Sequence, residues 1–408
     1  MTLATLAVLA VLAGAAPAPP RLTVQEYAVD SGHSIVEFSV GFAATHIKGR
    51  FPETRGTILY DPASPERSSV SIVIEAKSID TGWPHRDDHL RTDDFFAVDS
   101  FPTITFQSMS LARAGDGWTM RGPLTMHGVT KTVEIPFRFI APPSRRPESG
   151  WMILNAVGGL RLAWKDFGIP GGSRHNSWFD PLRRATVADT VEVSLEIEGW
   201  LADAASQRPQ GVAATLDRIR DSGVEAQLDR LRAVRGDKSD AQFAPYFHGG
   251  DMVVRALIAD GRTAEAVALA RGLVPLFPNL ASAYLVHGFA LSVAGDRREA
   301  ARQYARAREV FQPPVDDPNE RYKQDDPSWY YNDQLVHSAL EWGRVREAVA
   351  LAEAIRSIYP TTARAHVTLG LAQTLAGDAD GARVSYAHAL ELDPRETRAI
   401  EWQRRLRP

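Results

Sequence analysis

Over residues 27–201, apolar side chains recur at every second position. The segment "SIVEFSVGF" places them at Val36, Phe38, Val40 and Phe42, and "TVEVSLEIEGW" alternates apolar residues with Glu and Ser. A period of two with polar partners is typical of strands that have one buried and one wet face. Many such strands joined by Asp, Gly and Pro turns predict an antiparallel barrel, which we prefer to a sandwich because closure leaves no long exposed edges.

The alternation also predicts which side chains face the barrel interior. A small closed barrel either fills its interior with side chains or holds one ligand. The inward face is rich in Phe, Ile, Val and Met and carries no fixed carboxylate or cation, which suits an extended alkyl or isoprenoid chain; the alternative is a dry core of the same residues. The predicted cavity-lining residues are Val36, Phe38, Val40, Phe42, Ile72, Ile74, Phe95, Phe96, Ile104, Phe106, Leu124 and Met126.

After a predicted linker at 202–211, helical spacing replaces the strand pattern and an internal repeat appears. Four glycines are each followed at the fifth position by alanine, in "GRTAEA", "GDRREA", "GRVREA" and "GDADGA". The first two glycines lie 34 residues apart, as do the last two, and the middle interval is 48. The extra length corresponds to a Pro- and Asp-rich insertion near 315–328, which we interpret as a surface loop or an interaction site.

This pattern resembles the tetratricopeptide repeat (TPR), whose unit is a helical hairpin. The motif positions that match are Gly288 and Gly370 in the first helix, Ala266, Ala300, Ala348 and Ala382 in the second, Tyr304 and Tyr386 at the aromatic site, and Pro278, Pro360 and Pro394 at the ends of units. Val254 and Val336 replace the first-helix glycine, so the first and third units are degenerate. The resemblance implies four units over 247–408, preceded by a helical cap or degenerate repeat at 212–246, and a concave surface that docks a peptide or protein.

The first half resembles the YceI-like family. The resemblance rests on "YAVDSGHSIVEFSV", "HIKGRF", "RDDHLRTDDFFAVDSFPTITFQS" and "GPLTMHGVTKTVEIPF". It implies a lipocalin-like barrel over 22–201 that binds a polyisoprenoid, quinone or other long-chain lipid outside the cytoplasm. The predicted fold class is therefore multi-domain, all-β followed by all-α. Two features depart from the family pattern: the bulky segment "RHNSWFDPLRR", and the residues Trp83 and His85.

The segment from His85 to Val98, "HRDDHLRTDDFFAV", is unusually crowded with charge. His85 and His89 could share a helix face as zinc ligands do, but Arg86 stands where a metalloprotease has its glutamate base. We therefore expect no metal and interpret the segment as a crossing between strands. In that position His89 or Arg91 could meet the polar head of a ligand, and Lys131 in "HGVTKT" is a further candidate.

The N-terminal residues and the composition narrow the remaining possibilities. Residues 1–18, within "MTLATLAVLAVLAGAAPAPP", predict a secretory signal peptide, although they contain no Lys or Arg, and hence a periplasmic or extracellular protein. No later segment is apolar enough to span a membrane. The absence of cysteine excludes disulfides and thiolate chemistry, and a net charge of −4 argues against nucleic-acid binding.

We therefore expect an exported binding protein without a cofactor, not an enzyme and not an integral membrane protein. Its predicted partners are a long-chain lipid in the barrel and a protein on the repeat surface. One alternative is a TPR scaffold whose barrel binds nothing. Another is a metal-dependent enzyme that uses His85 and His89.

Overall fold

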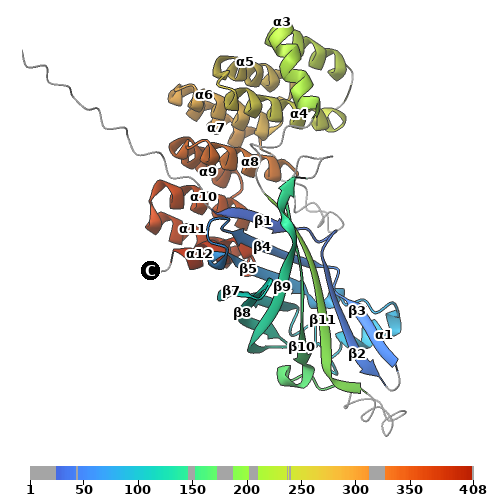
Figure 1. Cartoon of the computed structure of the whole chain (residues 1–408). Helices are drawn as coiled ribbons and strands as arrows, with labels where there is room; N and C mark the ends of the chain where they lie inside the picture. The colour runs from blue at the N-terminus through green and yellow to red at the C-terminus, as the bar shows by residue number, and fades with distance from the viewer. Residues whose placement is uncertain are drawn as a thin grey trace, which may run out of the picture.

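A computed structural model describes residues 24–42, 45–145, 152–171, 187–201, 210–236, 238, 240–311 and 327–406. The predicted signal peptide and most of the predicted linker and insertion lie outside these residues. The expected order of an antiparallel β-barrel followed by helices is confirmed (Figure 1). Among the described helices, none is both long enough and apolar enough to cross a bilayer.

The described strands include a closed antiparallel ring of eight. In order of pairing, and returning from the last to the first, these are β1 (Gln25–Val29), β4 (Thr54–Tyr60), β5 (Ser69–Glu75), β6 (Thr103–Gln107), β8 (Gly117–Met126), β9 (Val129–Arg145), β10 (Met152–Ala163) and β11 (Val187–Leu201). Closure pairs the edges of the sheet with each other, so this ring needs no other cover for its backbone groups.

Three further strands extend the ring. The strand β2 (Ile35–Phe42) follows β1 along the same edge of β11 and pairs on its other side with β3 (Thr45–Arg50), while β7 (Ser110–Ala114) pairs with β8.

The helix α1 (Pro84–Arg91) lies between β5 and β6 in the chain. The residues after it send Phe95 and Phe96 into the core cluster of the barrel. Short 3₁₀ turns are η1 (Pro65–Arg67), η2 (Ala76–Ser78), η3 (Trp164–Phe167) and, in the helical half, η4 (Val274–Leu276).

The helical half is built from successive helices that pack on one another. They are α3 (Gln210–Arg235), α4 (Asp240–Ala259), α5 (Thr263–Leu273), α6 (Ala281–Val293), α7 (Arg297–Val310), α8 (Pro327–Glu341), α9 (Val345–Ile358), α10 (Ala363–Ala376), α11 (Ala379–Leu392) and α12 (Thr397–Arg405). The pairs α4/α5, α6/α7, α8/α9 and α10/α11 form hairpins. Each hairpin turns on one of the four repeat glycines, whose φ angles are positive at Gly261 (74°), Gly295 (93°), Gly343 (68°) and Gly377 (81°). Only glycine adopts this backbone conformation without strain.

Small residues let the two helices of a hairpin approach closely. The alanines Ala266, Ala300, Ala348 and Ala382 are buried to 2% exposure or less. Gly370 on α10 faces the ring of Tyr386 on α11, so that a Cβ atom added there would lie 2.6 Å from the ring, and Gly288 faces Tyr304 in the same way. These contacts give a physical reason for the glycine and aromatic positions of the repeat.

Replacing Gly370 by alanine is expected to lower the free energy of unfolding by about 1–3 kcal/mol, because the methyl group overpacks the contact with Tyr386. Chemical denaturation of the full chain measures the change. Gly211→Ala is the matched control, because a Cβ atom at Gly211 meets nothing within 4 Å. An equal effect at both positions would show that the tyrosine contact is not the cause.

The last helix docks on the outside of the barrel. Figure 1 shows the helices in an arc that reaches the strands β4 and β5 at α12. Two barrel residues, Val24 and Leu59, belong to the same apolar cluster as the core of the helical half. The two halves therefore share one continuous core at this junction.

Candidate functional site

The barrel encloses an apolar cavity. Strand alternation places Ile58 of β4, Ile72 of β5 and Phe106 of β6 in its wall, and Leu124 and Ile135 continue the wall on β8 and β9. The cavity has a volume of about 170 Å³. One water needs only about 10–15 Å³ of such space, so the interior is not plugged by its own side chains. An apolar void of this kind gives water few polar partners and favours an apolar occupant.

Seven of the predicted lining residues do line this cavity. They are Val36, Ile72, Ile74, Ile104, Phe106, Leu124 and Met126. All lie on strands of the ring except Val36, which lies on β2. At these positions the face that the period-two pattern predicts to point inward surrounds the cavity, and ligand contact by these residues stays a prediction.

The other five predicted lining residues lie elsewhere. Phe38 and Phe96 pack against Phe51, with the centroids of the Phe51 and Phe96 rings 5.7 Å apart. Phe95 packs against the same apolar cluster and contacts the ring of His89, and none of the three lines the cavity. Val40 and Phe42 lie on the part of β2 that pairs with β3, outside the ring. The period of two continues to Phe42 because β2 pairs with β11 on one side and with β3 on the other up to that residue.

Most of the lining that sequence reasoning missed comes from the later strands. The strand β10 was not recognised, although Leu154, Ala156, Gly158, Leu160 and Leu162 alternate along it and all line the cavity. Its signal is weak because the small residues in the middle of the strand interrupt the apolar pattern. Further lining residues come from β9 and β11 and include Phe137, Phe139, Val193, Leu195 and Ile197.

Two of the three basic head-group candidates hold the crossing segment together. Arg91 donates to the backbone carbonyls of Lys77 (2.8 Å) and Ile79 (2.9 Å) and pairs with Asp88. His89 Nε2 lies 3.2 Å from a carboxylate oxygen of Asp94. These contacts fix α1 against the residues that follow β5.

The third candidate, Lys131, lies at the rim of the barrel. Lys131 pairs with Leu124 across β8 and β9, and residues paired across strands point to the same face of a sheet. Leu124 lines the cavity, whereas Lys131 is exposed. The side chain of Lys131 therefore leaves the backbone on the inward face of the sheet, at the end of the barrel where this face is open to solvent.

The two histidines considered as metal ligands do not converge. His85 stacks on Trp83 with ring centroids 6.1 Å apart, while His89 faces Asp94 and Phe95. Among the described residues, the metal-ligand types that do converge are Asp30, His33 and Glu198, with His33 Nδ1 at 2.7 Å from Asp30 and 3.9 Å from Glu198.

This trio is explained by hydrogen bonding. Burial alone would raise the pKa of Asp30, but hydrogen bonds from His33 and the Gly32 backbone outweigh it and hold that pKa below its ordinary value. His33 thus pairs with an ionised carboxylate in a tight turn between β1 and β2. We assign no metal to these residues.

The wall formed by β1, β4 and β5 has a second buried face, which sequence reasoning took to be solvated. Ile58 and Ile72 point into the cavity, whereas their neighbours Thr57 and Ser71 point outward and are only 2% and 3% exposed. The helix α12 covers them. Small hydroxyl side chains at outward positions, together with the outward Leu59, are the signal that could have indicated a covered face.

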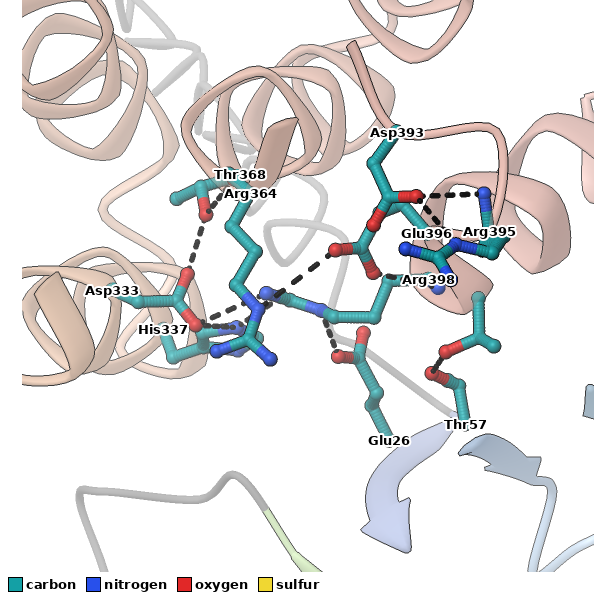
Figure 2. A network of polar contacts seen from close by, with 11 residues as sticks. Glu26, Thr57, Asp333, His337, Arg364, Thr368, Asp393, Arg395, Glu396 and Arg398 are labelled. Carbon is teal, nitrogen blue, oxygen red and sulfur yellow. Dashed lines mark hydrogen bonds and ion pairs between the residues drawn. The ribbon is translucent and has the colours of Figure 1, made fainter. Parts of the chain in front are cut away.

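A cluster of buried charges lies where α12 meets α8 and the barrel (Figure 2). Arg398 of α12 pairs with Glu26 of β1 and with Asp333 of α8, the latter at 3.1 Å, and donates to His337 Nε2 at 3.0 Å. Thr368 of α10 donates to the other oxygen of Asp333. Arg398 therefore joins α12 to β1 and α8, and α10 is linked through Asp333. Each carboxylate that Arg398 meets also has another partner, Thr368 for Asp333 and Trp402 for Glu26.

The ionisation of Asp333 makes this cluster sensitive to acid. Burial alone would raise the pKa of Asp333, but the positive charge of Arg398, supported by His337 and the Thr368 hydrogen bond, outweighs it and holds the pKa below the ordinary 3.8. A carboxyl group with a lowered pKa stabilises the folded protein fully above pH 3.8. This stabilisation is lost as the pH falls through the pKa that the group has in the folded state.

We expect wild type to melt at a higher temperature than Asp333→Asn near neutral pH, and the difference to shrink below pH 3.8. Thermal unfolding between pH 3 and pH 7 measures both proteins. Burial raises the pKa of Glu396, in spite of the nearby charges of Arg364 and Arg398. Glu396 therefore makes the folded protein less stable as the pH rises, whereas Asp333 makes it less stable as the pH falls. The comparison with the variant isolates Asp333, and a difference that does not depend on pH would contradict the assignment.

The closed antiparallel ring with an apolar void defines the class of protein, a β-barrel that can enclose a small apolar ligand. Residues 27–199 match the model of the YceI-like domain. The chain is 34% identical over 148 residues to a UPF0312 protein of Vibrio cholerae, covering 35% of this chain and 77% of that one. It is also 34% identical over 177 residues to a UPF0312 protein of Pseudomonas aeruginosa, covering 43% and 86%. The chain belongs to the YceI-like family.

Solved structures with some similarity are more distant. The crystal structure of Burkholderia cenocepacia BcnA has 23% identity and a TM-score of 0.35, covering 42% of this chain and 98% of that one. A polyisoprenoid-binding domain from Saccharophagus degradans has 15% identity and a TM-score of 0.31, covering 43% and 98%. Neither is close enough to assign a ligand to this chain.

Proposed function

We propose that the barrel binds one long apolar chain, such as a polyisoprenoid, a quinone or another long-chain lipid. The observation that carries the proposal is the apolar cavity, whose lining comes from strands around the ring. The lining is aliphatic and aromatic, with Tyr60 and Ser68 as its polar members. Such a wall favours apolar contact over directional recognition, so binding instead of catalysis is the role it supports.

Burial of an alkyl chain supplies enough energy for this function. Each buried CH₂ group contributes about 0.8 kcal/mol. A segment of ten such groups would gain roughly 8 kcal/mol before the costs of association are subtracted. The cavity therefore needs few polar contacts to retain a ligand.

Of the three basic candidates, Lys131 is the best placed to meet an anionic head group. It begins on the interior face and is exposed at the rim, whereas Arg91 is held by two backbone carbonyls. His89 and Arg91 would contribute by fixing the crossing segment. This arrangement puts an apolar tail inside and a charged head in solvent.

The proposal extends to the helical half, which we assign to the TPR class. The support is the combination of four left-handed glycine turns, four buried alanines and two glycine–tyrosine contacts at the motif positions. The chain itself links two of the hairpins, since Arg255 of α4 donates to Gln334 of α8 at 3.3 Å and both residues are buried. A protein partner would therefore bind beside this contact or displace it. Export to the periplasm or the extracellular space completes the proposal and rests on residues 1–18.

The test is mass spectrometry of an organic extract of the purified full-length protein. We expect a long-chain isoprenoid, quinone or acyl lipid at up to one molecule per chain, depleted in an extract of Ala156→Trp, in which the cavity is filled. The same lipids in equal amount in both extracts would refute cavity binding. A tightly held stoichiometric metal would instead favour the metal-dependent enzyme.

A further inference from the structure

The strands β4 and β5 have one face in the cavity and the other against α12. Thr57 Oγ1 shares a 2.7 Å hydrogen bond with Thr397 Oγ1, and Ser71 Oγ donates to Glu401 at 2.6 Å. Thr57 and Ser71 directly precede the cavity-lining residues Ile58 and Ile72 in the sequence. A single layer of backbone therefore separates the candidate ligand from the helical half.

We propose that α12 is an external buttress of the lipid cavity, and that filling the cavity and docking α12 strengthen each other. This inference rests on the proposed lipid-binding function and adds a way of regulating it. The residues that would carry the effect are Thr397, Glu401 and Trp402, as positioning residues that never touch the ligand.

The docking contacts are close and buried, which makes them sensitive to the position of the wall. Glu401 is fully buried, and Trp402 Nε1 donates to Glu26 of β1 at 2.7 Å. Hydrogen bonds between buried groups weaken steeply when distance or angle changes, and a buried polar group left without a partner is costly. A small displacement of β1, β4 or β5 would therefore be felt at α12.

An empty cavity leaves the inner side chains of this wall without packing partners. Filling it restores their dispersion contacts and restricts the motion of the strands. A stiffer wall keeps its outer hydroxyl groups in register with α12, which gives the coupling a positive sign. Thermodynamic linkage then requires that docking of α12 raises ligand affinity by the same factor.

The coupling would extend beyond α12. Arg398 lies on the same helix as Glu401 and Trp402 and pairs with Asp333 of α8, which in turn accepts from Thr368 of α10 (Figure 2). The occupied and empty states of the barrel would thus differ in how firmly the last helices of the array are held. A partner bound to the array would in turn change lipid affinity.

The first test uses the unmodified full chain and hydrogen exchange. The probe is 11-(dansylamino)undecanoic acid, a fluorescent fatty acid whose binding is followed by its emission. At saturation we expect exchange in the segment 397–406 to slow by about fivefold or more, the lower end of typical coupling. The helix α7 is the internal reference and should not change.

The second test measures the reciprocal effect. The double variant Thr57→Val with Ser71→Ala removes both hydroxyl contacts to α12 without altering the cavity lining, and should bind the probe about fivefold more weakly. Thr125→Val is the matched control, because it removes the hydroxyl hydrogen bond with Thr130 on an exposed part of the barrel. Its affinity should equal that of wild type.

The outcomes separate the two proposals. If the probe binds but exchange in 397–406 is unchanged, or if the double variant binds the probe as wild type does, the coupling between α12 and the cavity is contradicted. The proposed lipid binding is not contradicted by either result. If neither this probe nor any extracted lipid binds the wild-type chain, both proposals fail. Slower exchange together with weaker binding by the double variant supports the buttress.

Discussion

Arg398→Ala is expected to lower the free energy of unfolding by about 3–5 kcal/mol, the usual cost of removing one partner of a buried ion pair. The variant leaves Glu26 and Asp333 buried without their shared cation, and the remaining hydrogen bonds from Trp402 and Thr368 offset only part of their desolvation. Arg398 is 12% exposed at its side chain, and its partners are equally shielded. Urea denaturation followed by circular dichroism measures the loss.

The matched control is Arg383→Ala, which breaks an exposed ion pair with Asp380 at the same end of the chain. The Arg383 side chain is 47% exposed, and such pairs contribute less than about 1 kcal/mol. In the double variant Arg398→Ala with Asp333→Asn, the total loss should be smaller than the sum of the single losses, because the two residues interact directly. An Arg398 effect as small as that of Arg383 would mean that the junction contributes little to stability.

Ala156→Trp should weaken binding of a long-chain ligand by about a hundredfold. Ala156 lines the cavity from β10 between Phe139 and Ile197, so an indole there occupies space for several CH₂ groups at about 0.8 kcal/mol each. Titration of the dansylated fatty acid measures the affinity. Arg161→Trp is the control, since Arg161 lies on the outer face of the same strand with its side chain 76% exposed. Equal weakening in both variants would show that the tryptophan acts on the barrel generally and not by filling the cavity.

The barrel and the hairpin turns were predictable because each follows from a local pattern. Alternation selects the face of a strand wherever one face is apolar, as at Ile72 and Phe106. The repeat glycines are equally local, since a left-handed turn between two helices requires a residue without a Cβ atom. Patterns of this kind can be recognised without knowing which elements meet.

The features that could not be predicted depend on meetings between distant elements. Nothing in "TRAIEWQRR" indicates that Glu401 will lie against Ser71, 330 residues earlier in the chain. The lining of β10 was missed because Gly158 and Ala156 are small, and the ring has to be closed before their positions face the cavity. Val40 and Phe42 continue the alternation of β2, but the sequence does not say that these positions lie beyond the cavity.

The most direct test of the central claim is a calorimetric titration of the full chain with saturated fatty acids of increasing length, from eight to eighteen carbons. If the barrel buries the chain, affinity should rise about fourfold for each added CH₂, the equivalent of 0.8 kcal/mol, until the cavity is full. It should then level off. Affinity that does not depend on chain length, or no binding at any length, would contradict the account.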